Sequence, residues 1–544
     1  RRTADRLMKT TAQQRWDNLE LFRSIYLRRA IDCSALTIPS LIPESDQYSG
    51  WEGEQYNATP SLYQGAGASG VNSLSAKLLL SLYPPAAPFF RLTMDSARVR
   101  QYVEREGGDE ADITTQLDQV LSKMERQMMR RLDQLQARPA LFEAIKHLVV
   151  GGNALMYIGK DAIKMYGLRS YCVDRDPEGN VNEIVLKEQV SSKFLPAGYD
   201  SGDSQTTGLK DDESDQPKDV YTHVEFDYSK DRVEWYQECH GKKLPNSAGF
   251  SRIDNNPWLA LRLHSIAGES YGRSMCEEVL GDLQSLESLT QAIVEGSLIA
   301  AKAIGLVNPN GMTRADVLSR ASNGSIVAGN AADVEFVQVQ KNNDFSTALQ
   351  TMQILERRIQ VTFLSNEAVQ RNAERVTAAE IRLMAESLEA GLGGVFSLLS
   401  AEMQLPLINR MMYLMTEAGE FPPIPSGMVQ PVVSTGLEAI GRGNDKARLT
   451  EFLQTIAAAL GPDQFASYIN PSELVRRFAA ADGIDTAGLV KTEEELQAEQ
   501  AQSEQAMLAQ QLTQGAIQNG TATAPQPTNG ISPTGSAGGV PAAA

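Results

Sequence analysis

Residues 275–302 have the sequence MCEEVLGDLQSLESLTQAIVEGSLIAAK, and this segment determines the architecture expected for the whole chain. At about 100° per residue, its apolar side chains gather on one helical face and its polar side chains on the other. The apolar face holds Val279, Leu283, Leu286, Ile293 and Val294, and the polar face holds Glu277, Glu278, Gln284, Ser285, Ser288, Gln291 and Glu295. We therefore predict one long helix over 275–302, packed on one side and meeting water or a partner on the other.

A second amphipathic helix is predicted over Ser346–Phe363, where apolar residues recur at helical spacing: Met352, Leu355, Ile359 and Phe363. The first helix stops at the turn Asn308–Gly311, and strand-like segments follow at Ser325–Ala328 and Val334–Gln340. Two such helices have too little core between them to stand alone. A neighbouring surface would have to supply the missing contacts.

A third helix is predicted from Thr377, after a polar connector over Ser365–Arg375. Thr377 and Glu380 form a capping box, and apolar residues repeat along one face as far as Met403. If it continues to Pro406, this helix is about 45 Å long at about 1.5 Å per residue. We expect a bend at Gly393-Gly394 or near Pro406, although the paired glycines equally suit close approach by a neighbour.

The rest of the chain mixes helices and strands, so the predicted fold class is α+β, mainly α. Helices are expected over Leu7–Ile31, Leu141–Val150, Asp445–Leu460 and Pro471–Ala481. Strands are expected between residues 154 and 263, with a Pro/Gly turn over Asp174–Asn180, at Tyr171–Val173, Val181–Leu186, Tyr221–Phe226 and Val233–Glu238. The acidic insert 198–219 and the tail after Lys491, which has no Lys or Arg, are predicted to be disordered.

Composition excludes several classes of protein. The 544 residues include 50 Lys+Arg and 68 Asp+Glu, a formal net charge of −18, which disfavours tight binding to nucleic acid. Four distant cysteines give neither a zinc spacing nor a disulfide framework and suit a reducing compartment. No apolar run approaches the length of about 18 residues that a membrane-spanning helix needs, and no signal segment is visible. We therefore expect no membrane partner.

The short motifs that suggest chemistry all fail on inspection. Gly65–Gly70 matches G-x-G-x-x-G but follows no apolar strand, and Gly268–Ser274 has the wrong spacing and cation for a phosphate loop. A calcium loop starting at Asp174 cannot close, because Val185 stands where the bidentate Glu is needed. The four histidines are scattered, and His147 is predicted to be a packed residue. We therefore predict no enzyme activity, cofactor or metal site.

Several long segments resemble the portal protein, or head-to-tail connector, of short-tailed bacteriophages. They are LFEAIKHLVVGGN (141–153), GESYGRS (268–274), LGDLQSLESL (280–289), IGLVNP (304–309), VQRNAERVTAAEI (369–381), QLPL (404–407) and STGLEAIGRG (434–443). The resemblance runs in order from about residue 15 to residue 443. It is weakest in the acidic insert and the C-terminal tail.

The resemblance implies a ring, typically of twelve subunits, with a central channel at one vertex of the capsid. Double-stranded DNA would be packaged through it by a separate motor, the terminase large subunit, without sequence-specific contacts, and later ejected. The tail adaptor protein would dock to the ring, which also contacts the major capsid and scaffolding proteins and nucleates procapsid assembly. The protein would be found in the virion, and in the host cytoplasm during assembly.

The family architecture also divides the chain. It implies a wing over 1–268, a first stem helix over 269–302, a clip over 303–345 and a second stem helix over 346–364. A tunnel loop or valve over 365–376, a long wing helix with its continuation over 377–434, a crown over 435–490 and a disordered tail over 491–544 complete the subunit.

Three sets of candidate site residues follow from that division. In the tunnel loop, the side chains that would face the DNA channel are Asn366, Gln370, Arg371, Asn372, Glu374 and Arg375. The polar face of the first stem helix, turned toward the lumen or an adjacent subunit, holds Glu277, Glu278 and Glu295. The clip would meet terminase and tail adaptor through Asn308, Asn310, Arg314 and Arg320.

Alternatives stay open at this point. Arg371 and Arg375 would either touch DNA phosphates transiently or form intersubunit salt bridges. An oligomeric nucleotide-dependent enzyme, based on the glycine motifs, and an acidic scaffold protein are the competing functions.

Overall fold

The computed structural model describes residues 11–44, 61–84, 88–94, 110–196, 217–301, 304–322, 324–337, 342–364, 391–421, 429–433, 450–456, 458 and 474. The chain divides into two compact units, Arg1–Ile440 and Gly441–Ala544. In the second unit, residues 450–456 are helical, within the helix predicted over 445–460. Apart from Leu474, the other helix predicted there lies outside the described residues, as do the tail and residues 198–216 of the acidic insert. Residues 217–219, predicted to be disordered as part of that insert, instead begin a strand.

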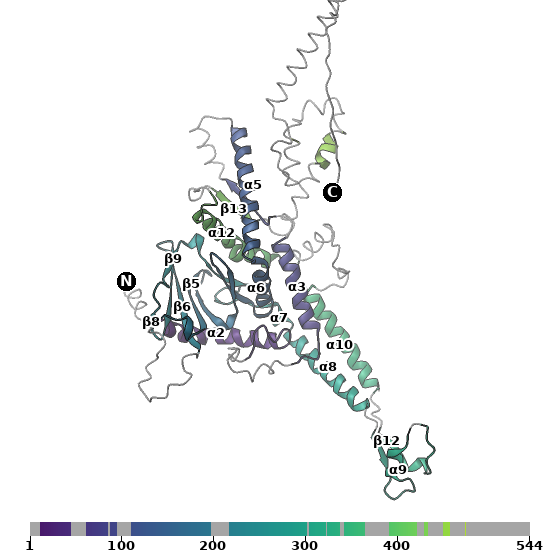
Figure 1. Ribbon diagram of the computed structural model, residues 1–544. Helices are drawn as coiled ribbons and strands as arrows, with labels where there is room; N and C mark the ends of the chain where they lie inside the picture. The colour runs from purple at the N-terminus through teal and green to yellow at the C-terminus, as the bar shows by residue number, and fades with distance from the viewer. Residues whose placement is uncertain are drawn as a thin grey trace, which may run out of the picture. The chain divides into compact units, whose positions relative to one another are not determined.

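The first unit combines helices with antiparallel sheets, which confirms the α+β class (Figure 1). Its helical elements are α2 (Ala12–Ala35), α3 (Ala66–Leu82), α5 (Glu110–Gln134), α6 (Ala137–Gly151), α7 (Met275–Glu278), α8 (Leu280–Ala301), α9 (Ala315–Arg320), α10 (Asn342–Thr362), the π-helix η7 (Ser400–Gln404) and α12 (Leu405–Glu417). Single-turn 3-10 helices lie between several of the strands.

The largest sheet has the order β4-β5-β6-β7-β8, with β9 also paired to β7. Its strands are β4 (Tyr171–Arg175), β5 (Val181–Ser191), β6 (Pro217–Asp227), β7 (Arg232–Cys239), β8 (Lys242–Lys243) and β9 (Gly249–Ser251). The predicted turn between β4 and β5 is present, and Asp176 Oδ1 accepts a hydrogen bond from the Asn180 backbone N–H at 2.8 Å. Asp176, one of the carboxylates in the calcium-like segment that begins at Asp174, therefore caps a turn.

Helix α2 packs against this sheet. Thr11 and Gln14 form a capping box at its start. Trp16 lies with Cys172, Val185 and Tyr221 in a small apolar cluster between helix and strands. The sequence places this helix correctly, but it runs four residues further than predicted, to Ala35.

Helix α6 lies in the main core. It ends at Gly152, whose φ of 73° is in the left-handed region that favours glycine. The strands β2 (Asn153–Ile158), β3 (Ile163–Tyr166) and β10 (Trp258–Arg262) form a second sheet, in the order β10-β2-β3. His147 is buried with its ring against Gly167, so its predicted packing role is confirmed.

The sequence did not predict helix α5, helix α9, strand β11 (Ile304–Val307) or the pairing of β1 (Phe90–Met94) with β13 (Val429–Val433). Two further predictions were wrong. The helix over 275–302 is interrupted at Val279, whose φ of −112° and ψ of 15° separate α7 from α8. Ser325–Ala328 forms no strand. No described atom of the chain lies within 4 Å of a Cβ built on Gly393 or Gly394, so close approach there stays a prediction about an adjacent subunit.

The segment 391–417 is the one helix in the described chain that is long and apolar enough to cross a membrane by length and composition. Interspersed polar residues hid it from a search for uninterrupted apolar runs. Its buried residues recur on one side and pack into the main core: Val395, Leu399, Met403, Leu407 and Met411. That pattern is typical of the core helix of a folded domain.

Candidate functional site

Helices α8 and α10 run side by side away from the sheets and carry a small tip at their far end (Figure 1). The tip contains the pair β11 (Ile304–Val307) and β12 (Val334–Val337). We call α8 and α10 the hairpin and residues 304–337 the tip. Arg358 pairs with Asp282 at 3.1 Å, and Thr290 Oγ1 donates to Met352 Sδ at 3.6 Å, which fixes the register of the helices.

The apolar stripe predicted on the second helix faces the first. Leu355, Ile359 and Phe363 are buried, and Met352 is half-buried. On α8, Leu283 and Leu286 are buried as predicted, whereas Val294 is 39% exposed. The far half of the hairpin therefore leaves apolar surface uncovered within one chain.

Helix α3 closes the base of the hairpin through glycines. A Cβ on Gly70 would lie 2.5 Å from Phe363 Cδ2, and one on Gly67 would lie 2.7 Å from the carbonyl oxygen of Leu36. Lys77 Nζ donates to the Leu364 carbonyl oxygen at 2.6 Å, and burial lowers the pKa of this lysine. The glycines of Gly65–Gly70 thus permit close packing, which agrees with rejecting a dinucleotide site.

The loop before α7 is packed in the same way. The Asn153 side chain accepts a hydrogen bond from the Gly272 N–H at 2.7 Å and donates to the Gly272 carbonyl oxygen at 2.9 Å. Ser274 Oγ accepts from the Glu277 N–H at 3.1 Å and caps α7. Because Gly272 is engaged on both sides by a side chain, the loop has no open cradle for phosphate.

Glu277 corrects a prediction. It was placed on a free polar face, but its carboxylate accepts from Arg273 at 3.0 Å and lies 3.0 Å from an Arg29 guanidinium nitrogen. Arg273 also pairs with Glu269 at 2.6 Å. This network ties α7 to α2 within one chain, so Glu277 is a structural residue at the base of the hairpin.

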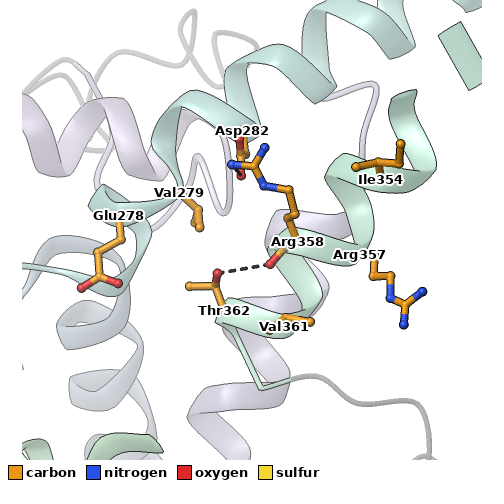
Figure 2. A pocket seen from close by; sticks show the side chains of 8 residues that line it. All are labelled: Glu278, Val279, Asp282, Ile354, Arg357, Arg358, Val361 and Thr362. Carbon is orange, nitrogen blue, oxygen red and sulfur yellow. Dashed lines mark hydrogen bonds and ion pairs between the residues drawn. The ribbon is translucent and has the colours of Figure 1, made fainter. Parts of the chain in front are cut away.

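The other two predicted stem residues are exposed. Glu295 accepts from Gln291 Nε2 at 2.9 Å on the outer edge of α8. Glu278 ends α7 and borders a groove between the helices, which has a volume of about 560 Å³. The groove is lined by Glu278, Val279, Asp282, Ile354, Arg357, Arg358, Val361 and Thr362 (Figure 2).

The groove contains a cation that the sequence reasoning missed. Figure 2 shows Arg358 reaching toward Asp282, while Arg357 and Glu278 lie on opposite sides of the opening. Among the described residues, Arg357 has no ion-pair partner. The sequence contains no specific signal for it, since Arg-Arg pairs also occur at 28–29, 130–131 and 476–477.

The tip is folded around polar contacts. The Asp333 carboxylate accepts from the Thr313 N–H at 3.1 Å and its hydroxyl at 3.2 Å, and Thr313 is buried. The Asn308 N–H donates to the Asp333 carbonyl oxygen at 2.8 Å, and the Asn308 side chain accepts from the Asn310 N–H at 3.1 Å. Two of the predicted clip residues, Asn308 and Asn310, therefore shape a turn.

The remaining clip residues are on the surface. Arg320 is exposed, and Arg314 is 79% exposed with Asp316 at 3.6 Å. The tip also exposes two apolar side chains that were not predicted: Met312 is 88% exposed and Ile326 is fully exposed. Large apolar residues scattered in a Gly-, Asn- and Ser-rich segment were the signal for this surface.

The predicted tunnel loop cannot be located. Asn366, Gln370, Arg371, Asn372, Glu374 and Arg375 all lie outside the described residues, which stop at Leu364 and resume at Gly391. Within the described part of the chain, no group of three or more His, Cys, Asp or Glu side chains is arranged to hold a metal ion. The four thiols are free and buried, and burial raises the pKa of Cys33 to about 12.

Residues 9–490 match the model of a family described as bacteriophage head to tail connecting protein. Three relatives named portal protein cover nearly the whole chain. The relative from Enterobacteria phage T3 is 40% identical over 94% of this chain and 92% of its own length, and that from Escherichia phage T7 is 38% identical over 96% and 94%. The relative from Enterobacteria phage SP6 is 31% identical over 92% and 93%.

Among solved structures, similarity is found to chains of gene transfer agent particles. One is from the neck of an empty particle computed with C6 symmetry, with a TM-score of 0.37 and 11% identity over 78% of this chain and 90% of that one. Another is from a native virion, with a TM-score of 0.32 and 12% identity over 77% and 90%.

Proposed function

The chain belongs to the family of bacteriophage head to tail connecting proteins, the portal proteins, and we propose that it forms a closed ring of the twelve subunits that the family resemblance implies. Portal proteins are structural parts of the virion rather than enzymes. In this proposal the channel of the ring passes double-stranded DNA, driven inward by terminase large subunit and later ejected. The ring also receives the tail adaptor and contacts the major capsid and scaffolding proteins.

One structural observation supports this proposal beyond family membership. Helices α8 and α10 project together from the rest of the first unit and end in the small folded tip. A ring of such hairpins makes a tube with a circle of tips at its mouth. We assign the hairpin to the stem, residues 304–337 to the clip, and the sheets with their helices to the wing. The segment 365–376 remains the proposed tunnel loop, and 435–490 the crown.

The clip is the proposed docking site for terminase and tail adaptor. The tip exposes both the cations Arg314 and Arg320 and the apolar Met312 and Ile326, a combination that suits a protein surface with acidic and apolar groups. Substitution of Met312 and Ile326 by serine should leave rings intact and weaken adaptor binding. Adaptor binding equal to that of the unaltered ring would contradict this assignment.

The tunnel loop is the proposed point of contact with moving DNA. Arginines at a constriction would touch phosphates without reading sequence. We expect Arg371→Ala with Arg375→Ala to leave ring assembly intact and to lower DNA packaging or retention. Unchanged packaging by intact rings would exclude this role and leave intersubunit salt bridges as the explanation.

The function itself is tested by electron microscopy and native mass measurement of the purified chain. A large closed ring with a central hole, without ATP hydrolysis, is the expected result. Hydrolysis by the purified chain, or assemblies that exchange subunits and lack a channel, would overturn the proposal.

A further inference from the structure

The hairpin presents two unlike faces. One, the groove face, is formed by the groove residues and continues toward the tip. The other, the ridge face, lies about half a turn away around each helix, because residues advance about 100° per position. On α10, the groove residues Ile354, Arg357, Arg358 and Val361 lie on one side, and Leu349 and Glu356 on the other.

The charges of the two faces are complementary. On the groove face Arg358 is neutralised by Asp282, while Arg357 lacks an ion-pair partner in the described chain. Glu278 also borders the groove, at its base, across the opening from Arg357 (Figure 2). The ridge face carries Glu287 and Glu356, and the Glu287 carboxylate accepts the backbone N–H groups of residues 63 and 64.

Large and small side chains are complementary as well. Toward the tip, the ridge face bears Val294, Leu298 and Leu349, which are 39%, 60% and 43% exposed. At the same height, set by the Thr290–Met352 contact, the groove face bears the small side chains Ala292, Gly296, Thr347 and Thr351 together with the longer, polar Gln350. The ridge face thus carries protruding apolar residues at the level where the groove face carries mostly small ones.

We propose that the groove face of one copy packs against the ridge face of the next copy, bringing Arg357 beside Glu356 of the adjacent subunit. This rests on the ring proposed above and assigns the pairing that closes it. Two different patches meet, so the contact is heterologous and propagates around a ring. Both faces belong to the same hairpin. Rotating one copy about an axis parallel to the stem therefore brings its ridge face against the groove face of the next copy without a shift along the axis.

The experiment uses two full-length charge reversals, Arg357→Glu and Glu356→Lys. In Arg357→Glu every interface would join two acidic faces, and in Glu356→Lys two basic faces. We expect each reversal to raise the dissociation constant of the contact between subunits by about tenfold or more, so that closed rings are lost from either variant alone. An equal mixture of the two should close again, because alternating subunits restore an opposite-charge contact at every interface.

Rescue on mixing also shows that both variants are folded. A control, Gln353→Lys, adds a charge on the exposed outer edge of α10 and should leave rings intact. Ring closure by either reversal alone, or failure of the mixture to close, would overturn the pairing while leaving the portal function standing. Absence of rings from the unaltered chain would instead overturn the proposed function, and the pairing with it.

Discussion

Replacing Glu402 with Gln should loosen the attachment of η7 and α12 to the sheet behind them. The Glu402 Oε1 atom accepts from Arg262 Nε at 2.9 Å and Nη2 at 2.6 Å, and Oε2 accepts the Arg262 backbone N–H at 2.9 Å. Arg175 Nη1 lies 3.7 Å from the same carboxylate. The three side chains are only 4% to 14% exposed, so these charges have little water to replace a lost partner.

The magnitude follows from burial. Removing one partner of a buried ion pair costs about 3–5 kcal/mol, because the remaining charge is left without compensation. Gln keeps the shape of the side chain and can accept one bond, but it leaves Arg262 and Arg175 facing each other without an anion. At about 1.4 kcal/mol per factor of ten, local opening should become roughly a hundredfold to several thousandfold more frequent.

Amide hydrogen exchange measures that opening directly, without requiring the whole ring to unfold in two states. We expect faster exchange in β10 and α12. A matched control is Glu417→Gln at the end of α12, where the pair with Lys160 spans 3.1 Å but the side chains are 45% and 65% exposed. An exposed pair is worth about 0–1 kcal/mol, so exchange should change by less than about fivefold. Equal effects of the two substitutions would refute the reasoning.

Three further predictions concern packing and titration. Gly70→Ala should destabilise the hairpin base by about 1–3 kcal/mol, seen as a lower thermal midpoint, because the new methyl group meets Phe363; Gly281→Ala, with open space around it, should not. Burial lowers the pKa of His147 to about 4, so stability should fall as pH drops from about 6.5 toward 4, and denaturant titrations of His147→Gln should lack that part of the loss. Burial raises the pKa of Cys33 to about 12, so thiol reagents at pH 8 should label it only after unfolding, and rapid labelling of the native protein would contradict the packing.

Local patterns predicted the local structure. The β4–β5 turn was identified because its chemistry lies in one short segment, from Asp176 to Asn180, and the stripe on α10 because its period is helical. The pairing of Leu92 with Pro431 was not predictable, since neither segment has a sequence pattern that specifies a pairing partner so far away in the chain.

The candidate site shows the same limit. The hairpin was predicted, but the break at Val279 depends on how α7 is held by its surroundings. Glu277 was misassigned for a related reason: its partner Arg29 comes from the first helix, and periodicity alone cannot distinguish a solvated carboxylate from one paired across the fold. Arg357 was overlooked because a groove exists only once two helices are packed.

The positions of the arginines sharpen the meaning of the net charge of −18. Arg23 donates to the carbonyl oxygens of residues 168, 169 and 171, and Arg410 to those of residues 158 and 255. Arg175 likewise donates to the carbonyl oxygens of residues 179 and 260. These positive charges are buried, so they offer nothing to a phosphate outside. Buried carboxylates such as Glu125, Glu183 and Glu238 offset them, so the accessible surface keeps roughly the acidity of the formal sum. A channel lined by such subunits would hold DNA weakly, since each phosphate neutralised by a surface cation adds to affinity. Any grip on moving DNA then has to come from a few exposed cations, which is why removing Arg371 and Arg375 should affect packaging while leaving assembly intact.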